Sequence, residues 1–224
     1  MVPASPADAD GPAPDRAPID PTSAEAFARL ARACGIGPGE AARLHADLVA
    51  RHAEPHRRHH VLAHVGAVLH HLDVTAAGLD DQRAVRLAAW YHDAVYDPRR
   101  ADNEEASARL AAAELSGAGV DGPLVADVER LVRVTAGHRP RTADERALCD
   151  ADLAVLAADR EGYERYRSGV REEYDFVADA TWRVGRARVL EGLLDGPLFH
   201  TEAFADREGR ARENLLAELR TLAG

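Results

Sequence analysis

The stretch Leu87-Ala-Ala-Trp-Tyr-His-Asp-Ala-Val-Tyr96 is apolar except for one adjacent polar pair, His92 and Asp93. Its apolar residues recur with the spacing of a helix that packs into a core. Burying a polar group costs free energy unless that group finds a partner. A divalent cation would partner both side chains, so the pair predicts a metal site in a helical protein. Because adjacent residues diverge by about 100° around a helix, other segments must complete the site.

Two further segments offer ligands for the same cation. One contains His59, His60 and His64, and the other contains Asp150 and Asp152. The pattern Thr-x-x-Glu at residues 142–145 predicts a helix start. On that helix Asp152 lies within an apolar stripe, whereas Asp150 points elsewhere, either to support a ligand or to face solvent. A carboxylate in such a stripe is expensive unless it is paired or metal-bound, the alternative being a salt bridge to an arginine. The predicted ligand set is His60, His92, Asp93 and Asp152.

The remainder of the chain predicts a single all-α domain. Residues 1–22 are rich in proline, alanine and aspartate, so we expect a disordered tail. Residues 23–224 lack the alternation of apolar and polar residues that is typical of strands, and their apolar residues instead recur with helical periodicity. The expected helices cover residues 23–33, 38–52, 59–72, 81–95, 103–116, 122–136, 143–158, 161–179, 181–194 and 205–222.

Composition limits the functional classes. The 224 residues carry a net charge of −10, which argues against a broad nucleic-acid surface but leaves room for a local arginine cluster around one phosphate. Two cysteines are too few for a disulfide framework. The absence of a long apolar run and of a secretory pattern leads us to expect a cytoplasmic protein without a membrane anchor. Its oligomeric state is left open.

Several polar residues near the ligand segments are candidates for substrate contact or proton transfer. His64 lies one helical turn after His60, and Glu104 and Asn103 open a helix shortly after the His-Asp pair. The plainer interpretation of Asp102 with Glu105 is a capping box. His138 follows a glycine at a helix end, where a cation also suits the helix dipole. Arg58 is a candidate for holding phosphate oxygens.

Together these motifs resemble the HD superfamily of metal-dependent phosphohydrolases, in particular a bacterial group of predicted HD phosphohydrolases of about this size. The resemblance covers nearly all of the chain after the tail, and one departure is His59, where the group usually has a tyrosine that is not a ligand. The matching residues are Arg58-His59-His60 with His64, His92-Asp93 with Tyr96-Asp97, Asp102-Asn103-Glu104 with Ser107-Ala108, Thr135 with His138, Asp150-Ala151-Asp152-Leu153, Arg171 with Glu173-Tyr174, Gly185-Arg186, and Ala211-Arg212 with Asn214.

The resemblance implies an all-α HD bundle with His60, His92, Asp93 and Asp152 as ligands of one divalent metal ion. Two imidazoles and two carboxylates suit Mn, Co, Ni, Fe, Mg or Zn without selecting among them. The expected reaction is hydrolysis of a small phosphate ester, with nucleotides among the candidate substrates. Asp93, Glu104 and His64 are the expected catalytic residues, and Arg58, His138 and Asn103 the expected substrate contacts. The alternatives are a di-iron oxygenase with His64 and His138 at a second metal, and a non-catalytic metal- or nucleotide-binding module.

Overall fold

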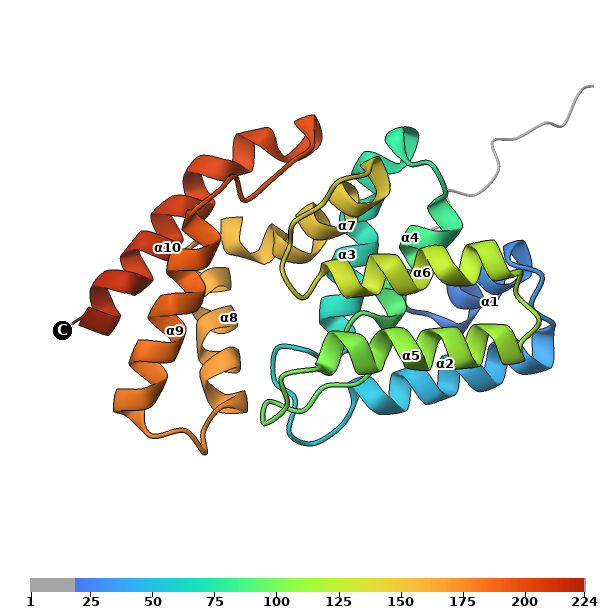
Figure 1. The fold of residues 1–224 in the computed structure, drawn as a ribbon, viewed down its shortest axis with the longest axis horizontal. Helices are drawn as coiled ribbons and strands as arrows, with labels where there is room; N and C mark the ends of the chain where they lie inside the picture. The colour runs from blue at the N-terminus through green and yellow to red at the C-terminus, as the bar shows by residue number, and fades with distance from the viewer. Residues whose placement is uncertain (1–18, 224) are drawn as a thin grey trace, which may run out of the picture.

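The computed structural model describes residues 19–223, and within them every regular element is helical (Figure 1). The all-α fold class is thereby confirmed, and the expected disorder of the tail falls almost wholly on residues outside this range. No helix in the described part is long and apolar enough to cross a bilayer. The elements are α1 (Ala24–Ala33), α2 (Pro38–His52), α3 (Leu62–Thr75), η1 (Ala76–Gly78), α4 (Gln82–Tyr91), α5 (Asn103–Gly117), α6 (Gly122–Val134), α7 (Ala143–Leu153), η2 (Ala154–Ala157), α8 (Arg160–Glu173), α9 (Asp179–Leu194), η3 (Glu202–Arg207) and α10 (Glu208–Ala223).

The first hydrophobic core lies among α1 to α7, with α4 at its centre. Seven of the ten residues of α4 are buried, including Trp90 and Tyr91. A helix that is apolar on nearly all sides must be covered on all sides, and α4 contacts α1, α3, α5, α6 and α7. Residues 87–91 therefore form the last half of the central helix of this bundle, and His92 and Asp93 follow at its end.

A second hydrophobic core lies among η2, α8, α9, η3 and α10. Leu156, Leu190, Phe204 and Leu215 are its most buried members. In Figure 1 helices α8, α9 and α10 stand together beside the first bundle, and α7 followed by η2 leads from one group to the other. Asp152 lies at this junction, between Ala151 of the first core and Leu153 of the second.

Side chains cap the starts of five helices, which are α1, α4, α6, α7 and α8. Thr142 and Glu145 form the expected capping box at the start of α7. The expected capping box at Asp102 is wrong, because its carboxylate accepts hydrogen bonds from the Arg100 guanidinium and caps no backbone N–H of α5. That salt bridge is exposed, and a bidentate guanidinium satisfies the carboxylate as well as the helix end would.

The largest departures from the expected helix ends occur beside the candidate site. Helix α3 starts at Leu62 and not at residue 59, α4 ends at Tyr91 and not at residue 95, and α8 ends at Glu173 and not at residue 179. The chain after Leu153 continues as a 3₁₀ turn. The late start of α3 and the early end of α4 leave backbone groups of residues 58–60 and 93–94 free to bind side chains from other segments.

Candidate metal centre

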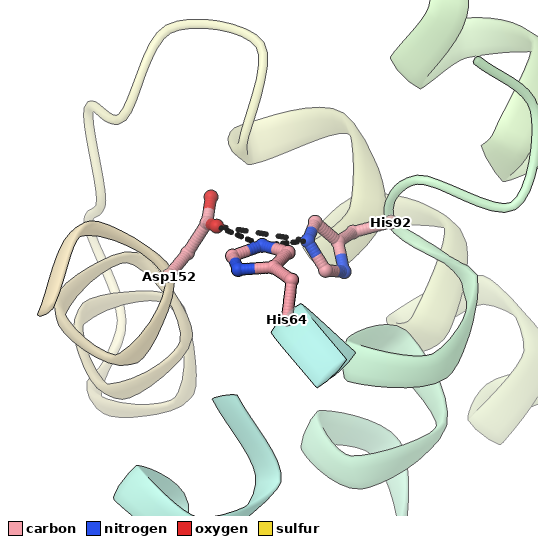
Figure 2. Close-up of side chains that lie close together, drawn as sticks. All are labelled: His64, His92 and Asp152. Carbon is pink, nitrogen blue, oxygen red and sulfur yellow. Dashed lines mark hydrogen bonds and ion pairs between the residues drawn. The ribbon is translucent and has the colours of Figure 1, made fainter. Parts of the chain in front are cut away.

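Three side chains from distant segments converge where α3, α4 and α7 meet. His64 comes from the first turn of α3, His92 is the C-cap of α4, and Asp152 lies in the last turn of α7. Figure 2 shows the two rings and the carboxylate pointing toward one another. Their ligand-type atoms all lie within 4.8 Å of one another, so these three residues could hold one metal ion.

The distances within the cluster match the spacing of ligands around a first-row cation. His64 Nε2 lies 3.1 Å from His92 Nε2 and 3.0 Å from Asp152 Oδ1, and His92 Nε2 lies 3.6 Å from that same oxygen. Ligand atoms that each sit about 2.0–2.2 Å from a cation are roughly 3.0–3.6 Å apart. The residues therefore fit a divalent metal ion.

Asp93 stands at the edge of the same cluster. Its Oδ2 lies 3.1 Å from His92 Nε2 and 3.8 Å from His64 Nε2. Its side chain is only 15% exposed, and that of Asp152 is 14% exposed. The structure thus brings together three of the four predicted ligands, His92, Asp93 and Asp152, and adds His64 to them.

The electrostatics of the cluster favour ionised carboxylates. Burial opposes a negative charge on Asp93, but His92 and His60 outweigh it and hold the pKa of that carboxyl far below its usual range. Burial likewise opposes charge on Asp152, but its hydrogen bonds from His138, His64 and His92 hold its pKa well below the ordinary value. Burial lowers the pKa of His92, yet Asp93 and Asp152 raise it well above the ordinary value. A cation bound here would be favoured by the ionised carboxylates and would compete with the proton on His92.

His60, which we expected to be a metal ligand, lies outside the cluster of His64, His92 and Asp152. Its Nδ1 donates to Glu173 Oε2 at 2.7 Å, and its ring stacks on Tyr96 at 4.1 Å between centroids. His64, which was expected to be catalytic, lies in the cluster instead. The two histidines are one turn apart, and the late start of α3 at Leu62 moves His60 off the helix.

Glu173 is the residue that fixes the segment before α3. Its Oε1 accepts the backbone N–H groups of Arg58, His59 and His60 at 2.7, 2.8 and 3.1 Å. Its Oε2 accepts the His60 ring and the hydroxyl of Tyr96, the latter at 2.9 Å. Burial opposes the charge, but the His60 hydrogen bond and these backbone donors lower the pKa of Glu173 to about 2.

Arg57 fixes the loop that follows His92. Its buried guanidinium donates to the carbonyl oxygens of His60, Asp93 and Ala94, and to Glu54.

The His92 ring is oriented by its own helix, since Nδ1 donates to the Ala89 carbonyl at 3.0 Å. That hydrogen bond leaves His92 Nε2 as the metal-facing nitrogen, as in most metal sites that use histidine.

His138 extends the cluster on the side of Asp152. Its Nε2 donates to Asp152 Oδ2 at 2.8 Å, so the two oxygens of this carboxylate face different histidines. His138 has φ 47°, a left-handed conformation that is uncommon for residues other than glycine. The turn after α6 brings the ring to Asp152, and the alternative considered for Asp152, a salt bridge to an arginine, is absent among residues 19–223.

The other predicted site residues lie outside the cluster. Asn103 is buried and binds the backbone N–H and carbonyl of Asp97, so it shapes the loop. Arg58 is exposed, donates to the carbonyls of Pro55 and Arg57, and lies 3.4 Å from Glu172. Glu104 is half-buried in the first turn of α5, and its side chain pairs with nothing in the described part of the chain.

Sequence reasoning missed two residues that hold the site, and it left a third open. Glu173 stands within a quoted motif without an assigned role, and Arg57 has no expected role; the backbone groups that each buried charge binds come from distant segments, which only the fold brings together. Asp150 is fully buried and accepts the N–H groups of His200 and Thr201 and the Thr201 hydroxyl. It anchors the segment before η3, which leaves Asp152 as the carboxylate in the cluster.

No protein-family model matches the chain, and neither the curated proteins nor the solved structures include a match. The resemblance to HD phosphohydrolases therefore stays a prediction from the motifs quoted above.

Proposed function

We propose that the protein is a metal-dependent phosphohydrolase of the HD type that cleaves a small phosphate ester. The observation that supports this most is the convergence of two imidazoles and two carboxylates from three segments on a volume suited to one cation. His64, His92, Asp93 and Asp152 would hold the ion. When bound, a divalent cation supplies a water of lowered pKa and polarises a phosphoryl oxygen.

His60 is suited to transfer a proton to the leaving group. Burial disfavours its charged form, but Asp93 and the Glu173 hydrogen bond raise its pKa above the ordinary value. Because Nδ1 is bound to Glu173, Nε2 is the nitrogen left to exchange a proton. A protonated imidazole beside a phosphate ester acts as a general acid toward the departing oxygen. His60 thus takes the proton-transfer role that we expected of Glu104.

Asp93 is suited to orient the attacking water. Its Oδ2 is 3.1 Å from His92 Nε2, and the main-chain carbonyl of Asp93 is held by Arg57 at 2.7 Å. A carboxylate fixed from its own backbone loses little freedom when it accepts a hydrogen bond from water. A substrate would enter where His60 and His138 are partly exposed, at 21% and 20% of their side-chain surfaces.

The proposal is tested by loading the purified protein with single divalent metals and assaying a panel of phosphomonoesters and nucleotides, with elemental analysis of each sample. We expect about one to two metal ions per chain and turnover of at least one ester. Asp93→Ala should fold and lose turnover, whereas the exposed Asp195→Ala should behave as the wild type. An active, metal-loaded Asp93→Ala protein would refute the assignment.

A di-iron oxygenase is the second candidate function, and the geometry of Asp152 supports it. One oxygen of Asp152 faces His64 and the other faces His138 at 2.8 Å, as expected of a carboxylate that bridges two ions. Two irons per chain with oxygen consumption would support this reaction. Two redox-inert ions with ester hydrolysis would support phosphoryl transfer through a two-metal site.

A further inference from the structure

A cavity lies against the loop formed by residues 94–97. Its volume is about 350 Å³, and none of the four cluster residues lines it. The wall nearest the metal centre is the chain segment that follows Asp93 directly. Cavities of this size accept small metabolites.

The cavity is richer in cationic than in anionic side chains, although the whole chain is acidic. Three arginines line it, Arg51, Arg99 and Arg100, against two carboxylates, Glu54 and Asp97. Both carboxylates already accept hydrogen bonds. Glu54 accepts the buried Arg57 guanidinium at 3.0 Å, and Asp97 accepts the backbone N–H of Arg99 at 2.9 Å.

Arg99 is the cation with the most unused hydrogen-bonding capacity. Arg51 pairs with Asp47 and Arg100 with Asp102, whereas the Arg99 guanidinium makes no hydrogen bond or ion pair with residues 19–223. It lies over the Phe176 ring at 4.1 Å from the centroid. Stacking on an aromatic ring holds the guanidinium plane and leaves its N–H groups free for a planar or tetrahedral oxyanion.

Tyr96 connects the cavity to His60. It lines the cavity, and its carbonyl accepts the His56 ring N–H at 2.7 Å. Its ring stacks on His60, and its hydroxyl donates to Glu173. A ligand that contacts Tyr96 or His56 and displaces either residue would therefore change the environment of the hydrogen-bonded pair of His60 and Glu173.

We propose that this cavity binds a small phosphate-bearing anion through Arg99, with Arg51 and Arg100 in support, and that the bound anion acts on His60 through Tyr96. The site is distinct from the metal centre, so the proposal does not depend on the phosphohydrolase assignment. Guanidinium groups around a concave surface match phosphate oxygens in both charge and geometry.

The test uses the full chain with chelator present, so that no cation can recruit the anion to the metal centre. Pyrophosphate is titrated by calorimetry, and the imidazole signals are followed by NMR. We expect saturable binding, with shifts of both the His56 and His60 rings. Arg99→Gln should weaken binding by about 10- to 100-fold, as expected for loss of a charged hydrogen-bond donor.

Arg188→Gln is the matched control, because Arg188 is exposed on α9 and forms no ion pair with any residue in the described range. It should leave the affinity unchanged, and thermal melts should show that both variants fold. Absence of binding at millimolar pyrophosphate would overturn the proposal. Equal weakening by the two substitutions would do so as well, since it would indicate general charge attraction. Binding without any shift of the His60 ring would overturn the coupling through Tyr96.

Discussion

Two polar clusters in this protein satisfy their side chains in opposite ways, one through an arginine, a glutamate and two tyrosines and the other through two histidines and two aspartates. In the cluster of Arg186, Glu218, Tyr163 and Tyr166, every contact joins a donor to an acceptor: Arg186 donates to both Glu218 oxygens and to Tyr166, and Tyr163 donates to Glu218 at 2.6 Å. In the metal cluster, two imidazole nitrogens face each other at 3.1 Å. The first cluster is complete by itself, whereas the second requires protons or a cation.

This difference predicts which property each cluster controls. A network whose charges are matched contributes to stability only while all of its members remain, because removing one leaves the others buried and unpaired. A cluster of converging ligands contributes mainly through the ion that it binds. Substitutions in the two clusters should therefore affect different measurements.

The largest effect is expected for Asp152→Ala. Its carboxylate contacts His64 at 3.0 Å and His138 at 2.8 Å, so its removal takes a ligand from the centre. Metal affinity should fall by more than about 100-fold, the upper end for residues that merely orient ligands. With chelator present, its free energy of unfolding should fall less than that of Glu218→Ala. Titration calorimetry with Zn²⁺ or Mn²⁺ and urea unfolding provide the two numbers, and unchanged affinity would break the comparison.

Glu218→Ala should have the opposite profile. Glu218 and Arg186 have side-chain exposures of only 1% and 6%, so the substitution leaves a buried guanidinium without its carboxylate. Breaking such a pair costs about 3–5 kcal/mol. Replacing both residues, as Arg186→Met with Glu218→Leu, should recover much of that loss in urea unfolding. Folded Glu218→Ala protein should bind metal with the wild-type affinity, and a loss of affinity would show that the clusters are coupled.

The sequence predicted helix positions well where apolar periodicity alone determines them. Nearly every expected helix is present, and α2 has the expected bounds at Pro38 and His52. The errors gather at Leu62, Tyr91 and Glu173, where polar contacts between distant segments decide how far a helix continues. Such contacts are absent from any local pattern, so rules based on one helix overextend there.

The candidate site was predictable in composition but not in the detailed position of each residue. The converging segments and Asp152 follow from polar residues in apolar stripes. The choice between His60 and His64 depends on Glu173, which lies more than a hundred positions further along the chain and accepts three backbone N–H groups. The spacing of residues within 59–64 therefore cannot decide which of the two histidines lies in the cluster.

Glu173→Gln should produce an intermediate effect on both properties. The depressed pKa of Glu173, about 2 against 4.5, means that its charge stabilises the folded state above pH 4.5 and that this contribution is lost as the pH falls toward 2. The contribution is on the order of 3 kcal/mol. The variant should be less stable than the wild type at neutral pH, and the difference should shrink in acid. Urea unfolding at several pH values tests this, and a constant difference would contradict it.

The same substitution should alter catalysis if His60 donates a proton. Glu173 raises the pKa of His60, so its loss should move the alkaline limb of the pH–rate profile to lower pH. Turnover should fall by about 10²-fold, the lower end for removal of a general acid. A rate reduction with an unmoved limb would point to a purely structural role for Glu173.

A smaller effect is expected from pH on metal binding. The raised pKa of His92 means that the folded, metal-free protein gains stability from protonation below the ordinary pKa of 6.5 and loses it as the pH rises through the folded pKa. A cation must displace this proton, so affinity should rise by up to about tenfold per pH unit below that pKa. Calorimetry at constant ionic strength between about pH 6 and pH 9 tests the slope. An affinity independent of pH would mean that the cluster is unprotonated when empty.

The smallest effect, and the one that bears most directly on the comparison, is expected for Tyr166→Phe. The Tyr166 hydroxyl accepts Arg186 at 3.1 Å, and its ring lies 4.8 Å from the His59 ring, which in turn lies 4.8 Å from that of His64. The tyrosine is therefore the physical link between the two clusters. Removing one hydroxyl should cost about 0.5–1.5 kcal/mol in urea unfolding, because Arg186 keeps both Glu218 oxygens. Metal affinity should be unchanged, since the phenyl ring still supports His59; a shift in affinity would mean that the matched network also sets the position of the metal ligand His64.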